Sequence, residues 1–177
     1  MITEIDIADP SLVVLIGAAG VGKSTFAAHH FRDDEVLSSD RFRAMVSGDE
    51  ADQGATHAAF SRLHRELARR MAAGKLTVID ATSVEPSSRR ALLARAGAAG
   101  IPATAIVFDL PAETVVRRNA ARTSRVVDEG VVRHHLARLR ASLDGPAPLL
   151  YREGFAHVVV MRDPVEIDEV RIRRLPT

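Results

Sequence analysis

Residues 17–25, GAAGVGKST, have the spacing of a phosphate-binding loop: glycine, four residues, glycine, lysine and serine. Glycines let backbone N–H groups turn toward a phosphate, and a helix that starts after the loop adds its dipole. In such loops the lysine, here Lys23, reaches the β- and γ-phosphates, and the serine hydroxyl, here Ser24, binds Mg²⁺. We therefore predict a site for ATP or another nucleoside triphosphate with Mg²⁺. The nucleotide contacts expected from this loop are Gly17, Ala18, Ala19, Gly20, Val21, Gly22, Lys23, Ser24 and Thr25.

Three absences narrow the class of phosphate-binding loop. The apolar stretch LTVID ends in Asp80 followed by Ala81, so the second carboxylate that hydrolytic ATPases use to activate water is missing. The single asparagine, Asn119, precedes Ala120, which excludes the guanine-reading Asn-Lys-x-Asp motif, and protein-kinase signatures are absent. The remaining interpretation is a protein that passes its phosphate to a bound acceptor. Asp80 would then hold Mg²⁺ through water, and its alternative role is a helix cap.

A run of arginines lies in residues 115–125, VVRRNAARTSR. On one helix, Arg118, Arg122 and Arg125 would share a face, where three guanidinium groups repel each other unless an anion faces them. The equatorial oxygens of a γ-phosphate in transfer are such an anion, so these arginines are predicted to bind the nucleotide and Arg122 to be catalytic. The alternative is a solvated basic face.

The stretch LSSDRFR, residues 37–43, places a carboxylate and a guanidinium three positions apart. A helix that begins near Ser39 would bring Asp40 and Arg43 to one side. Asp40 can accept the proton of an attacking hydroxyl, and Arg43 can bind an anionic part of the acceptor. Alternatively, Ser39 or Asp40 only caps the helix.

Hydrophobic periodicity indicates the elements that would position these residues. Buried strands are expected at residues 11–17, 35–40, 75–82, 102–110 and 156–161. Helices are expected at 23–31, 56–73, 86–99, 112–122 and 128–143, with a short capped helix at 163–168 and an extended segment at 169–176. This alternation predicts one α/β domain over residues 1–177, a P-loop kinase fold with a mostly parallel five-stranded sheet and a helical arginine lid near 112–130. Ligands of such sheets bind at the carboxyl ends of the strands, where these polar groups would meet.

Composition bounds the possible partners. Lys plus Arg total 24 and Asp plus Glu total 23, which argues against a general nucleic-acid coat but leaves room for a local basic groove. There is no cysteine, no signal-peptide pattern and no apolar run long enough for a membrane span, so we expect a soluble, cytoplasmic protein. The histidine pairs at 29–30 and 134–135 do not suggest zinc, because adjacent helical residues point apart.

Several stretches of the chain stand in the order found in 5′-hydroxyl polynucleotide kinase domains. After the phosphate-binding loop these are LSSDRFR, DQGAT, LTVIDATSV, RRNAARTSR and EGF. The chain resembles the kinase module of bacterial RNA end-healing and sealing enzymes from about Ser11 to Met161. This resemblance implies that Lys23 and Ser24 bind phosphates and metal, that Asp40 is the general base, and that Arg43 holds the phosphate beside the 5′-OH. It also implies a supporting role for Gln53 and assigns the lid arginines to Arg118, Arg122 and Arg125.

Two departures accompany the resemblance. The family commonly reads Asp-Ala-Thr-Asn after the third strand, whereas position 83 here is serine, and its multidomain members continue beyond the point where this chain ends. The leading acceptor is the 5′-OH end of RNA or DNA, and the alternatives are a small-molecule kinase and a non-catalytic nucleotide-dependent binding module. Aromatic residues for base stacking are few, and Phe42 is the one expected near the acceptor.

Overall fold

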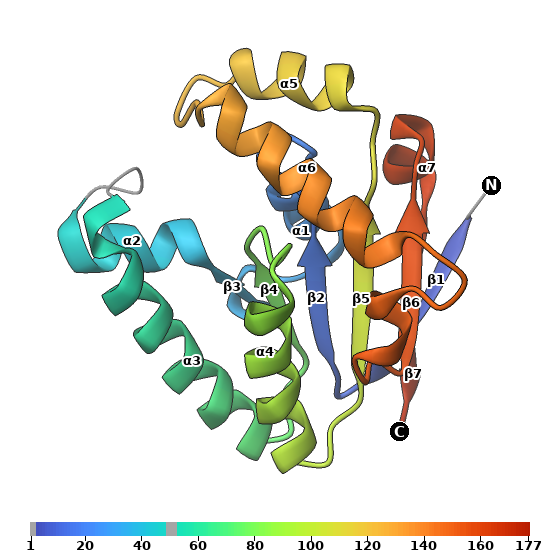
Figure 1. The fold of residues 1–177 in the computed structure, drawn as a ribbon. Coiled ribbons are helices and arrows are strands. Elements are labelled where there is room, and N and C mark those ends of the chain that lie inside the picture. The colour runs from blue at the N-terminus through green and yellow to red at the C-terminus, as the bar shows by residue number, and fades with distance from the viewer. Residues whose placement is uncertain (1–2, 49–52) are drawn as a thin grey trace.

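The structure is a computed structural model, which describes residues 3–48 and 53–177, the side chain of Gln53 excepted. At its centre lies a parallel sheet with strand order β3-β4-β2-β5-β6 (Figure 1). Its strands are β2 (Leu12–Ile16), β3 (Val36–Ser38), β4 (Thr77–Asp80), β5 (Ala103–Phe108) and β6 (His157–Met161). The predicted α/β fold with a five-stranded parallel sheet is confirmed, and the strands lie within the ranges expected from the sequence.

Helices cover both faces of this sheet. The α-helices of the described residues are α1 (Lys23–His30), α2 (Ser39–Ser47), α3 (Thr56–Ala72), α4 (Pro86–Ala98), α5 (Ala112–Ala120), α6 (Glu129–Leu143) and α7 (Pro164–Glu169), with 3₁₀ turns η1 (Asp33–Glu35), η2 (Gln53–Ala55) and η3 (Leu149–Arg152). Alternate residues of β2 enter two different cores. Val13 and Leu15 pack with side chains of α1 and α6, whereas Leu12, Val14 and Ile16 pack with α3 and α4. The central strand is therefore buried on both sides, as its continuous apolar sequence predicts.

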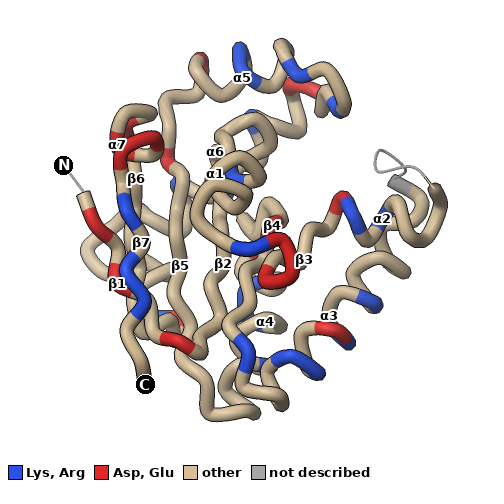
Figure 2. The backbone as a smooth tube through the Cα atoms, turned by 180° about the vertical axis from the view of Figure 1, so that it is seen from behind, with Lys and Arg blue, Asp and Glu red and all other residues tan. Residues whose placement is uncertain are grey.

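A second, two-stranded parallel sheet joins the ends of the chain. Here β1 (Glu4–Asp9) pairs with β7 (Arg171–Pro176), and Ile5 and Ile7 of β1 point into the core. Arg173 donates to Asp6, and basic residues on β7 run beside acidic residues on β1 (Figure 2). The sequence predicts the extended segment at 169–176 but does not predict β1, because the partner of this strand lies at the far end of the chain.

A buried arginine ties the turn after β4 to distant elements. Arg89 of α4 is fully buried and donates to both carboxylate oxygens of Glu153, at 2.6 and 2.7 Å. It also donates to the carbonyl oxygens of Ser83 and Val84 and to the Ser142 hydroxyl of α6. Because the turn carries part of the rim at the carboxyl ends of the strands, this network fixes one wall of the site described below.

The arginine lid, residues 112–130, departs from its predicted geometry. Helix α5 ends at Ala120, so Arg122 and Arg125 lie in a loop and do not share a helix face with Arg118. The side chain of Asn119 closes this loop: its amide nitrogen donates to the Val127 carbonyl at 2.7 Å, and its oxygen accepts from the Val127 N–H at 3.2 Å. This bridge competes with continuation of the helix, so the loop folds back before α6 begins.

Candidate active site

The phosphate-binding loop connects β2 to α1, as its mechanism requires. Gly20 and Gly22 have φ values of +88° and +105°, a region that favours glycine. A Cβ on Gly20 would lie 2.8 Å from the backbone nitrogen of Asn119, so this glycine also lets the C-terminal end of α5 approach the loop. Gly22 is the N-cap of α1 and provides no side-chain cap, which leaves the N–H groups of the first turn for an anion.

Lys23 stands at the start of α1 and is buried. Its Nζ donates to the carbonyl oxygens of Gly17 and Ala18, at 2.8 and 2.9 Å. The pKa of Lys23 is lowered to about 8, chiefly by burial; Asp80 opposes this shift and nearby Arg122 adds to it. The ammonium group is thus held inside the loop by weak neutral acceptors, which a phosphate oxygen can replace.

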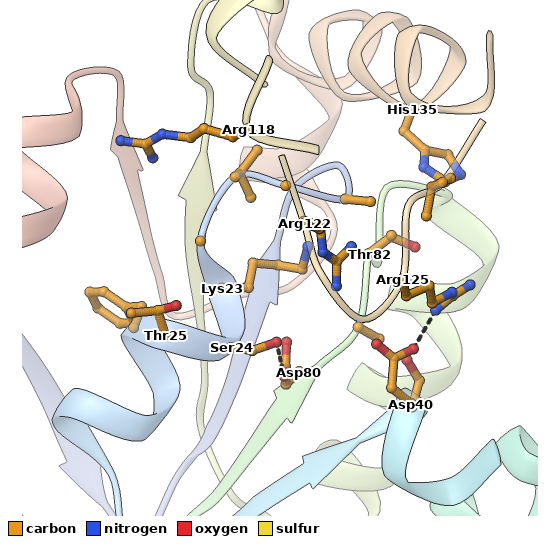
Figure 3. Close-up of a pocket in the computed structure, with 18 of the residues that line it drawn as sticks. Lys23, Ser24, Thr25, Asp40, Asp80, Thr82, Arg118, Arg122, Arg125 and His135 are labelled. Atoms are coloured by element: carbon orange, nitrogen blue, oxygen red, sulfur yellow. Dashed lines mark hydrogen bonds and ion pairs between the residues drawn. The ribbon is translucent and has the colours of Figure 1, made fainter. Parts of the chain in front are cut away.

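Ser24 and Asp80 meet beside this lysine. The Ser24 hydroxyl donates to Oδ2 of Asp80 at 2.7 Å, and Asp80 is the last residue of β4 (Figure 3). A hydroxyl and a carboxylate are oxygen donors of the kind that suits Mg²⁺, which is usually held by few protein groups together with water and substrate phosphates. No group of three or more metal-ligating His, Cys, Asp or Glu side chains exists among the described residues.

The arginines predicted for the lid line one cavity of about 880 Å³ together with the loop and Asp80. Figure 3 shows Arg122 directed toward Lys23, whereas Arg118 extends toward the side of Thr25. Burial lowers the pKa of Arg122, Arg125 lowers it further, and Asp80 opposes the shift. The three arginines therefore converge on the cavity from different directions. We name Lys23, Ser24, Thr25, Asp80, Arg118 and Arg122 the donor end of this cavity.

Asp40 lies across the cavity, at the start of α2. The cap of this helix is Ser38, whose hydroxyl accepts from the Arg41 N–H, so the predicted capping role of Ser39 or Asp40 is wrong. The carboxylate of Asp40 instead faces the cavity and forms ion pairs with Arg43 on its own helix and with Arg125 of the lid (Figure 3). Arg43 is buried, and both Asp40 and Arg43 line the cavity, as their spacing predicts.

Two polar residues in the cavity wall have no role assigned to them from the sequence. Thr56, the first residue of α3, and His135 of α6 both line the cavity, and the Thr56 hydroxyl and His135 Nδ1 are buried without a hydrogen-bond partner among the described residues. Thr56 is the last residue of the DQGAT stretch, from which the sequence singles out only Gln53, and His135 belongs to no motif. We name Asp40, Arg43, Thr56, Arg125 and His135 the acceptor end of the cavity.

Three further residues complete the comparison with the sequence. Ser83 has φ +49°, a left-handed conformation that asparagine adopts more readily than most residues, which fits the asparagine of the resembled family at this position. Phe42 packs partly buried against the core, whereas Phe60 lines the cavity. The side chain of Gln53 lies outside the described residues.

The fold and site together define a P-loop kinase-type nucleotide-binding domain. Residues 12–146 match the family described as AAA domain, so the chain belongs to that family. No helix of the described residues is long and apolar enough to cross a bilayer.

Solved structures with the same fold include RNA-repair proteins and small-molecule kinases. A chain of the Pnkp1/Rnl/Hen1 RNA repair complex is 23% identical with a TM-score of 0.65, and the match covers 76% of this chain and 45% of that chain. A sugar kinase from Janibacter sp. HTCC2649 is 20% identical (TM-score 0.57; 89% and 90% covered). Shikimate kinase from Acinetobacter baumannii in complex with shikimate is 18% identical (TM-score 0.55; 90% and 88% covered). The chain thus spans less than half of the RNA-repair chain, and no curated protein matches it.

Proposed function

We propose that this protein is a kinase that transfers the γ-phosphate of a nucleoside triphosphate to the 5′-OH end of RNA or DNA. The observation that carries the proposal is the Asp40–Arg43 pair, which faces the phosphate-binding loop across one cavity. It supplies both groups that such an acceptor needs: a carboxylate for the hydroxyl proton and a guanidinium for the adjoining phosphate.

The donor end would bind the triphosphate. Lys23 exchanges the carbonyl oxygens of Gly17 and Ala18 for phosphate oxygens, and the N–H groups at the start of α1 surround the β-phosphate. Mg²⁺, bound by the Ser24 hydroxyl and through water by Asp80, would supply charge neutralisation for the phosphate oxygens. Arg122 points into the same space and stabilises the charge of the group in transfer.

The acceptor end would bind the hydroxyl and activate it. The acceptor oxygen bonds to the γ-phosphorus while the bond from that phosphorus to the β–γ bridging oxygen breaks. Its proton passes to Asp40, and the nucleoside diphosphate leaves. Arg125 pairs with Oδ1 of Asp40, the oxygen that also pairs with Arg43, so Oδ2 would accept the proton of the hydroxyl. Arg43 remains beside Asp40 and binds the phosphate that follows the reacting nucleoside.

A small-molecule kinase is the second candidate. It is supported by the sugar kinase and shikimate kinase structures, because each match covers nearly the whole of this chain and nearly the whole of the matched chain. The cavity volume of about 880 Å³ also lies in the range of small-ligand sites. The two candidates differ in what Arg43 does, because an uncharged acceptor such as a sugar gives this guanidinium no anion to bind.

The deciding experiment compares a nucleoside 3′-monophosphate with the bare nucleoside as acceptor. Wild type should use the 3′-monophosphate at least about tenfold better in kcat/KM, and Arg43→Ala should erase the difference, since it removes one charged contact. Arg41→Ala is the matched control, because Arg41 lies on the same helix but pairs with Asp33. A wild type that treats both acceptors alike would contradict the polynucleotide proposal and favour an uncharged acceptor.

A further inference from the structure

Basic residues are concentrated on helices α3 and α4. Residues 56–99, which contain both helices, hold eight Lys and Arg but only three Asp and Glu, a net charge of +5, whereas the whole chain has a net charge of +1. Acidic residues gather instead on α7, on the opposite side of the molecule from α3 (Figure 2). The charge of this protein is therefore unevenly distributed, and the side with α3 and α4 attracts anions.

Most of this positive charge is not balanced by neighbouring carboxylates. Arg69 of α3 pairs with Glu66, and the buried Arg70 and Arg89 bind internal partners. Four further arginines are exposed and form no ion pair among the described residues: Arg62, Arg65, Arg90 and Arg95. Elsewhere on the surface, by contrast, Arg138 and Arg173 each pair with a carboxylate of a neighbouring element. The exposed guanidinium groups of α3 and α4 are thus available to an anionic partner.

Both helices begin at the cavity that holds Asp40. Thr56 and Phe60 of α3 line this cavity, and so does Thr82 in the turn before α4. The two helices lie side by side (Figure 1), and both run away from the carboxyl ends of the strands, because each leads to the start of a parallel strand. A nucleic-acid strand that leaves the cavity beside Phe60 therefore continues over the surface of α3 and α4.

The side chains along this path suit a single strand. His64 lies one helical turn after Phe60 on the same side of α3. Burial lowers the pKa of His64 and the charge of Arg95 lowers it further, so Arg95 of α4 lies near this row of α3. Phe60 is partly buried and offers an apolar ring to a base, and the exposed arginines offer positive charge to phosphates. We name Phe60, His64, Arg65, Arg90 and Arg95 the α3–α4 surface.

We propose that the α3–α4 surface binds the single strand of RNA or DNA that continues in the 3′ direction from the phosphate held by Arg43. The inference rests on the proposed function, which places the 5′-OH at Asp40 and the first phosphate at Arg43, in the cavity that Phe60 also lines. The repeated phosphates of the strand match the unpaired arginines in charge. Affinity for the acceptor should therefore increase with strand length until the strand covers this surface.

The test compares two acceptors, a 5′-OH RNA dodecamer and a nucleoside 3′-monophosphate, which is too short to leave the cavity. Wild type is compared with the double variant Arg65→Gln/Arg95→Gln, which removes two exposed charges and retains good helix formers. The matched control is Arg117→Gln/Arg171→Gln, which removes the same charge from exposed arginines of α5 and β7 that also form no ion pair among the described residues. Both kcat and KM are measured for each acceptor over a range of salt concentrations.

Wild type should have a lower KM for the dodecamer than for the 3′-monophosphate. Arg65→Gln/Arg95→Gln should raise the KM for the dodecamer about fivefold or more at low salt. It should also flatten the slope of log KM against log salt concentration by about 1.4, because each phosphate contact of a single strand contributes about 0.7. The kcat and the KM for the 3′-monophosphate should stay unchanged, since the reacting end keeps its contacts. The control variant should behave as wild type with both acceptors.

Two results would contradict the α3–α4 surface alone. One is a wild type with the same KM for both acceptors, and the other is an equal loss in the control variant, which would indicate general electrostatic attraction. A wild type that phosphorylates neither acceptor would contradict the proposed function, and the assignment of the surface would fail with it. Activity of wild type on the 3′-monophosphate therefore separates failure of the inference from failure of the proposed function.

Discussion

The donor and acceptor ends of the cavity are built in different ways. Half of the residues named as the donor end come from one continuous segment, residues 17–25, in which Lys23 donates to carbonyl oxygens of its own loop. The acceptor end is assembled from α2, α3, the lid loop and α6, and its central carboxylate, Asp40, is paired with lid residue Arg125. The phosphate-binding loop is thus fixed locally, whereas the acceptor end depends on the tertiary packing of four separate elements.

The largest effect is expected when the donor end is broken. Lys23→Ala should lower kcat/KM by at least about 10³-fold, because it removes a charged contact to the transferred phosphate in a site shielded from water. The fold should tolerate the change, because the lowered pKa of Lys23 indicates that burial of its ammonium group destabilises the folded protein. Lys75→Ala, at the other lysine of the chain and exposed, is the control. Near-normal turnover of Lys23→Ala in a steady-state assay would refute the donor site.

Breaking the acceptor end should affect catalysis but not nucleotide binding. Asp40→Asn keeps the shape of the side chain but loses the base, so kcat should fall about 10³-fold while the dissociation constant for ATP stays the same. Asp33→Asn, at an exposed aspartate that pairs with Arg41 outside this cavity, should have normal kcat. If Asp40→Asn weakened ATP binding and left kcat intact, Asp40 would belong to the donor end.

Within the donor end, the two lid arginines Arg118 and Arg122 are expected to have different roles. Arg122→Ala should lower kcat about 10²-fold, the usual cost of one transition-state contact. Arg118→Ala should mainly raise the KM for ATP, because Arg118 extends away from Lys23 toward Thr25. Rapid-quench measurement of single-turnover rates for both variants distinguishes the two effects. Identical behaviour of the variants would mean that the lid acts as an undivided basic surface.

The smallest expected effect is a pH dependence that only the donor end shows. Lys23 must be protonated to bind phosphate, and its pKa in the ligand-free protein is lowered to about 8. Affinity for a non-hydrolysable ATP analogue should therefore be constant below this value and fall by up to about tenfold per pH unit above it. Calorimetric titration across this range checks the slope, and Lys23→Ala should bind weakly without it. A flat wild-type profile would contradict the lowered pKa.

The same division explains what can be predicted from the sequence. The phosphate-binding loop is a local pattern, and the Asp40–Arg43 pair follows from helical spacing, so the sequence alone indicates both. The strands are predictable because a buried parallel strand is apolar throughout. These features depend on residues close together in the chain.

Features that depend on distant residues are missed by the sequence or predicted wrongly. The Arg125–Asp40 ion pair joins positions 85 residues apart, and the Arg89–Glu153 network joins positions 64 apart. The early end of α5 follows from the Asn119 bridge to Val127, which no helical periodicity reveals. From the sequence, the histidine pair at 134–135 suggests at most a zinc site, and its spacing disfavours that interpretation. The position of His135 in the cavity wall is missed because it depends on how α6 packs in the fold.

The central claim is transfer of phosphate to a 5′-hydroxyl end, and one measurement tests it directly. The protein is incubated with γ-labelled ATP, Mg²⁺ and a 5′-OH oligonucleotide, and the product is digested to nucleotides to locate the label. Our account predicts label on the 5′-phosphate of the first nucleotide with wild type and its loss with Lys23→Ala and Asp40→Asn. Label that appears only as inorganic phosphate, or on a small molecule and never on the oligonucleotide, would contradict it.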